Sequence, residues 1–74
     1  MKIKTVNVIE YVDDSIIGLT SFNDDQEGNQ EAEAHYKIIV KEHDPEVTDE
    51  EMEVFLEDGY YESGEYQAFI SHSS

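Results

Sequence analysis

The feature that most restricts this sequence is the absence of cysteine from a chain of only 74 residues. A chain of this length buries only about 60% of the surface that its unfolded form exposes, so it supports one hydrophobic core and not two. Without cysteine, disulfides and thiolate-bound metals cannot stabilise it. The sequence therefore predicts one small domain, residues 1–74, that depends on side-chain packing or on self-association.

Two segments near the N-terminus have the composition of β-strands. Residues 5–12 and 16–22 are rich in β-branched and aromatic side chains, which favour strands. Asp13 and Asp14 lie between the two segments and predict a tight turn. The alternation of apolar and polar residues in the first segment is imperfect, so we expect a β-bulge or a late start of the strand there.

A third strand is predicted for residues 32–41, where apolar and polar residues alternate most regularly. The preceding segment, residues 23–30, has no apolar side chain and contains Gly28 beside Asn29. This composition predicts a mobile hairpin loop between the second and third strands. The residues that would face the core from the third strand are Ala32, Ala34, Tyr36, Ile38 and Val40.

A helix is predicted for residues 49–58. Thr48 and Glu51 have the spacing of a capping box, and Gly59 is suited to the left-handed conformation that ends many helices. Residues 65–72 alternate again and predict a final strand. The expected fold is α+β: a small, mostly antiparallel sheet in β-β-β-α-β order, with one acidic helix packed on one face. The helix would turn Met52, Phe55 and Leu56 inward.

The charge of the chain is strongly negative and unevenly distributed. Nineteen Asp and Glu residues stand against four Lys, which gives a formal net charge of −15. No Lys or Arg follows residue 41, whereas ordinary soluble surfaces mix the two signs. The sequence predicts two acidic patches: Asp49, Glu50, Glu53, Glu57 and Asp58 on the helix, and Asp24, Asp25 and Glu27 in the loop.

These patches lead to a first hypothesis, a non-enzymatic binding protein that mimics nucleic acid. Rows of carboxylates can present to a cationic groove a field like that of the phosphate backbone. The small, acidic, cysteine-free composition is similar to that of inhibitors of restriction, repair or CRISPR enzymes encoded by phages and mobile elements. The resemblance is one of composition, and it implies an inhibitor of a cationic protein that binds DNA or RNA.

Three alternatives remain open at this stage. The chain could be a small adaptor that binds one cationic protein surface through the acidic helix, with Tyr61 as an exposed aromatic anchor. It could form a homodimer through a sheet edge, although the charge of −15 on each copy opposes association at low salt. Its acidity could also serve only solubility, in general or at high salt. In each case we expect Tyr60 to close over Phe55 and Tyr66 to join the core.

The sequence contains no pattern typical of an enzyme or of a cofactor site. It has no phosphate-binding Gly-rich loop and no nucleophile elbow, and His35, His43 and His72 lack metal-ligand spacing. We expect neither a metal nor a cofactor. Direct binding of nucleic acid is not expected because there is no basic patch. No apolar run approaches the roughly 18 residues of a membrane-spanning helix, and we expect a cytoplasmic protein.

Overall fold

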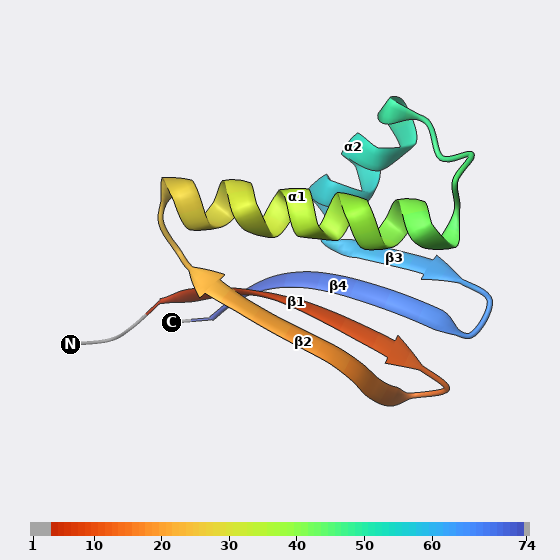
Figure 1. The fold of residues 1–74 in the computed structure, drawn as a ribbon, viewed down its shortest axis with the longest axis horizontal. Coiled ribbons are helices and arrows are strands. Elements are labelled where there is room, and N and C mark those ends of the chain that lie inside the picture. Colours follow the sequence, from red (N-terminus) through yellow and green to blue (C-terminus); the bar gives the residue numbers. More distant parts are fainter. Residues whose placement is uncertain (1–3, 74) are drawn as a thin grey trace.

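The computed structural model describes residues 4–73, and in it a four-stranded antiparallel sheet carries two helices on one face (Figure 1). The strand order in the sheet is β2-β1-β4-β3. The α+β class is confirmed, but the order of elements along the chain is β-β-α-α-β-β. The elements are β1 (Thr5–Val12), β2 (Ser15–Asn23), α1 (Gln26–His43), α2 (Asp49–Asp58), β3 (Tyr60–Ser63) and β4 (Tyr66–Ser73).

The first hairpin forms as the sequence predicts. Asp13 and Asp14 have φ angles of 51° and 65°, which is the conformation of a two-residue turn that matches the twist of the flanking strands. The expected bulge is present, but the extra residue belongs to β2. Glu10 pairs with Gly18 and Tyr11 pairs with Ile16, so that Ile17 is left without a partner in β1.

The largest error of the sequence prediction concerns α1. This helix replaces the strand expected at residues 32–41 and most of the loop expected at 23–30. Ala34 and Ile38, which the alternation placed in the core, are exposed. The side chains that are buried recur at the spacing of one helix face because this face packs on the sheet: Ala32, Tyr36, Ile39 and Val40.

The helix α2 has the predicted boundaries and caps. The Glu51 N–H donates to Thr48 Oγ1 at 3.2 Å, and the Thr48 N–H donates to Glu51 Oε1 at 3.1 Å. Gly59 ends the helix with a φ of 71°. The last predicted strand corresponds to β4, whereas the short strand β3 was not expected. It pairs with β4 through a turn at Gly64.

The core lies between the helices and one face of the sheet. Val6 and Val8 of β1 are at most 1% exposed, and Tyr36 of α1 is fully buried. Tyr66 is in this core, as expected, but so is Tyr61, which is only 3% exposed. The expected exposure of Tyr61 is therefore wrong.

The aromatic contact with α2 also differs from the prediction. Tyr61, and not Tyr60, packs edge to face against Phe55, with ring centroids 5.0 Å apart. Tyr60 points to the opposite side of the sheet, where it contacts Phe69. Neither helix within residues 4–73 is long and apolar enough to cross a membrane.

Candidate functional site

The acidic side chains predicted for the helix are all exposed on α2. The buried Met52 and the half-buried Phe55 and Leu56 turn one side of the helix towards the core. The opposite side then faces solvent, and Glu50, Glu53 and Glu57 form a row on it because residues three and four apart are neighbours on a helix. Its exposed carboxylates are those of Asp49, Glu50, Glu53, Glu57 and Asp58.

Two lysines of α1 lie close to Glu53, the middle member of this row. Lys37 and Lys41 line a groove of about 400 Å³ together with Asp49 and Glu53 of α2. Within residues 4–73, however, no lysine comes within 4.0 Å of a carboxylate oxygen, since the ion pair found there joins a histidine to an aspartate. The lysines therefore weaken the negative field at Asp49 and Glu53, whereas Glu50 and Glu57 do not line the groove.

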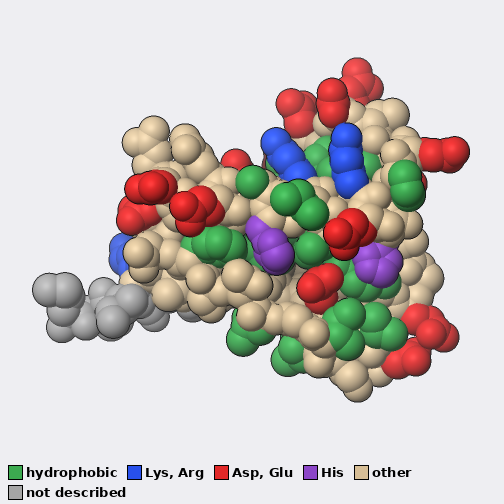
Figure 2. Space-filling view, in the orientation of Figure 1, with side chains coloured by type: hydrophobic (Ala, Val, Ile, Leu, Met, Phe, Trp, Pro, Cys, Tyr) green, Lys and Arg blue, Asp and Glu red, His purple; other side chains and the backbone are tan. Residues whose placement is uncertain are grey.

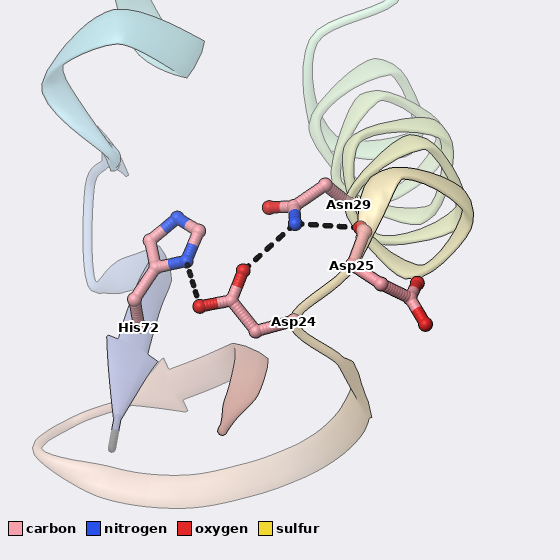
Figure 3. A network of polar contacts seen from close by, with 4 residues as sticks. All are labelled: Asp24, Asp25, Asn29 and His72. Carbon is pink, nitrogen blue, oxygen red and sulfur yellow. Dashed lines mark hydrogen bonds and ion pairs between the residues drawn. The ribbon is translucent and has the colours of Figure 1, made fainter.

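The second predicted patch has a structural role that the sequence did not reveal (Figure 3). The Asp25 side chain caps α1 by accepting the Gly28 N–H at 2.7 Å. Asn29 Nδ2 donates to Asp24 Oδ1 and to the Asp25 carbonyl oxygen, both at 2.8 Å. Asp24 Oδ2 also lies 3.5 Å from His72 Nδ1 at the end of β4. These two aspartates therefore hold the start of α1 against the sheet.

The same contacts affect the titration of Asp24. The hydrogen bond from Asn29 lowers the pKa of the Asp24 carboxyl below its usual value of 3.8, and the nearby His72 acts in the same direction. Glu27, the third residue of this patch, is exposed in the first turn of α1. There its charge is favourable because it faces the positive end of the helix dipole.

The two acidic groups lie on the same side of the sheet but are not contiguous. Figure 2 shows red side chains over the start of α1 and around α2, with blue side chains in between. The helix that separates the groups has 18 residues, which corresponds to a length of about 27 Å. The groups therefore form two patches. Asp25 of the first patch caps α1, whereas the named carboxylates of the α2 patch cap no helix.

The buried Tyr66 contacts the half-buried Glu10 and the exposed His43. Tyr66 Oη donates to Glu10 Oε1 at 2.7 Å, and the His43 ring stacks on the Tyr66 ring with centroids 3.5 Å apart. Burial and the nearby Glu10 carboxylate raise the pKa of the Tyr66 hydroxyl. The hydrogen bond and the ring stacking join the end of α1 to β1 and β4.

Sequence reasoning missed the outer face of the sheet, which no helix covers. Ile9 and Tyr11 lie on this face, in the phase of β1 opposite to Val6 and Val8. A strand with apolar side chains in both phases is typical of a sheet that is covered on both sides. The imperfect alternation of residues 5–12 was therefore the signal, although a bulge or a late start of the strand was expected from it.

The geometry defines a small two-layer α+β protein with an acidic helical side. No protein family, curated protein or solved structure matches this chain. Within residues 4–73, no group of three His, Asp or Glu side chains is arranged to hold a metal ion. The features that remain are two surfaces, the acidic side of α2 and the outer face of the sheet.

Proposed function

We propose that this protein is a non-enzymatic binding protein whose α2 carboxylates occupy a cationic site on another protein, in the manner of a nucleic-acid mimic. The observation that carries the proposal is the exposed row of Glu50, Glu53 and Glu57. No lysine within residues 4–73 pairs with it. The partner that fits is a protein with a Lys- or Arg-lined groove for DNA or RNA.

The spacing of the row supports this proposal. Residues at i, i+3 and i+7 on a helix place one carboxylate roughly every 5 Å along the axis. One strand of B-DNA carries a phosphate about every 3.4 Å along its axis. The two charge densities are of the same order, so a groove that binds phosphates can also attract this helix face.

The support beneath the row is rigid, which matters for recognition. The capping box at Thr48 and the left-handed Gly59 fix both ends of α2, and Met52 is buried beneath the helix. Carboxylates on such a helix lose little conformational freedom of the backbone when they bind, and this lowers the cost of association. The row nevertheless destabilises the free protein, because like charges three or four residues apart repel.

The test is a displacement assay with labelled duplex DNA bound to purified DNA-binding proteins of different folds. We expect the wild-type protein to displace DNA from at least one of them at about 50 mM salt and to lose this effect near 500 mM. The triple variant Glu50→Gln, Glu53→Gln, Glu57→Gln should be weaker by about tenfold or more, which corresponds to about 1.4 kcal/mol.

A matched control separates the row from the total charge. The variant Glu33→Gln, Glu42→Gln, Glu65→Gln removes three charges from exposed positions outside α2. It should inhibit almost as well as the wild type. Equal weakening of both variants would mean that only net charge matters, and no displacement by the wild type from any tested protein would remove the basis for mimicry.

A further inference from the structure

The outer face of the sheet carries a continuous apolar row that crosses all four strands. Each of its members lies directly opposite the next in the strand register, so their side chains are neighbours on the same face. Tyr11 flanks the row, with its ring centroid 5.4 Å from that of Phe69. The row consists of Leu19, Ile9, Phe69 and Tyr60.

The residues around this row resemble the layout of a protein interface. Ile16, opposite Tyr11 in the register, extends the apolar area on β2. Towards the other end of the strands the face becomes polar, with Asn7 between Ser21 and Ser71. The face therefore has an apolar area that reaches both edge strands and a polar area beside it, and protein–protein contacts likewise combine apolar and polar parts. A depression of about 290 Å³ on this face is lined by Ile9, Tyr11 and Phe69 together with the polar residues Asp14, Gln67 and Ser71.

The face is also almost free of charge, which is unusual in a chain with nineteen carboxylates. Among the described strand residues, the register turns only one carboxylate, that of Glu62, to this side. Its Oε2 accepts hydrogen bonds from Tyr60 Oη and Gln67 Nε2. The turn residue Asp14 lines the depression on this face as a second carboxylate. A cationic partner would gain little from a surface with so few carboxylates, whereas a second copy of an acidic chain can approach only where charge is low.

We propose that two copies of this protein form a symmetric dimer through this face, sheet against sheet. Antiparallel sheets pack in this way at an angle of about 30° and a distance of about 10 Å. The same patch on both copies makes the contact closed, so assembly stops at two. The acidic helices α1 and α2 then lie on the two outer sides of the dimer, where they remain accessible.

The size of the face suits a dimer of moderate affinity. From strand spacing and rise, the plan area of the sheet is roughly 450 Å². Projecting side chains increase the accessible area above this figure. Two copies would therefore bury about 1,000 Å² or somewhat more in total, which is near the lower limit for a specific interface. We expect a dissociation constant in the micromolar range.

Salt should favour this dimer. The carboxylates of the helices are separated from the contact by the thickness of the sheet, and the Debye length is about 8 Å at physiological ionic strength. Added salt therefore screens the repulsion between two copies of charge −15 while leaving the apolar contact intact. This dependence is opposite to that of the cationic partner in the proposed function, so the two proposals can fail separately.

The experiment is sedimentation equilibrium of the full chain over a range of protein concentrations at about 50 and 500 mM salt. The wild type should form a dimer, with a lower dissociation constant at the higher salt. The variant Ile16→Gln, Leu19→Gln changes two side chains that are 60% and 61% exposed. It should raise the dissociation constant by about tenfold or more without loss of folding, as judged by circular dichroism.

Two further variants keep the result unambiguous. Ile38→Gln, Val54→Gln alters side chains of similar exposure, 58% and 52%, on the helical side, and should leave the dimer intact. Phe69→Thr changes the centre of the face, away from either sheet edge, and should weaken it. A monomeric wild type at high salt, equal loss in the helical control, or a dimer unaffected by Phe69→Thr would each overturn the proposal.

Discussion

The two faces of the sheet differ in what covers them more than in what they are made of. On the inner face, Val6 and Val8 are at most 1% exposed beneath the helices. On the outer face, Ile9 and Tyr11 of the same strand are half-buried by their neighbours alone, and Leu19 is 61% exposed. The comparison teaches that this two-layer protein has strands suited to burial on both sides. The four predictions below test this contrast.

The largest change in the free energy of unfolding is expected for Tyr61, whereas its neighbour Tyr60 points to the opposite face of the sheet. Tyr61 is buried against Phe55 and Tyr66, so Tyr61→Ala should lower the free energy of unfolding by about 3–5 kcal/mol. Tyr60→Ala removes a ring contact with Phe69 on the outer face, and should cost only about 1 kcal/mol. Urea unfolding of dilute protein measures both. Equal losses would show that the outer face is packed as firmly as the inner one.

A substitution at the start of α1 tests how the helical layer is joined to the covered face. Gly28 is buried, and a Cβ added there would meet the Asn23 carbonyl oxygen. Gly28→Ala should therefore destabilise the protein by about 1–3 kcal/mol, although alanine favours helices. Thermal unfolding measures the effect, with Gly18→Ala as a milder control because only the flexible Glu10 side chain is near. An increase in stability would contradict the tight junction.

The acidic row should stabilise the protein when it is neutralised. In Glu50→Gln, Glu53→Gln, Glu57→Gln, three repulsive pairs on the exposed side of α2 are lost, which are Asp49–Glu53, Glu50–Glu53 and Glu53–Glu57. The free energy of unfolding should rise by about 0.5 kcal/mol. The gain should shrink at high salt because the repulsion is screened. A lower free energy of unfolding in this variant would mean that the three carboxylates make favourable contacts within the protein. They would then not be an unpaired surface for a partner.

The smallest effect concerns the network that ties α1 to β4. Because the folded protein holds the pKa of Asp24 below its usual value of 3.8, the charged form contributes stability at pH values above this usual value. This contribution is lost as the pH falls through the lowered pKa. Asp24→Asn should therefore be less stable than the wild type at pH 7, and the difference should vanish in acid. Urea unfolding across this range would show it, and a constant difference would rule the network out as its source.

The part of the candidate site on α2 could be predicted because its signals are local. The boundaries of the helix follow from Thr48, Glu51 and Gly59, whose contacts span at most four residues. Once the helix is known, its periodicity decides which carboxylates face outward. The patch around Asp24 and Asp25 was assigned to partner binding because the sequence placed a loop there. The structure shows that both side chains are used in starting α1.

The sequence by itself determined the first hairpin, α2 with its acidic row, and the last strand, because turns and caps depend on neighbouring residues. Only the tertiary structure decided between strand and helix for residues 32–41, since Ala32, Tyr36 and Val40 fit both periods. Residues 32–41 form part of a helix because the residues that pack on the sheet lie on one helix face. Every second residue would face the sheet if this segment were a strand. The same long-range packing created β3, buried Tyr61 and left one side of the sheet bare, and contacts of that kind cannot be derived from residues close in the chain.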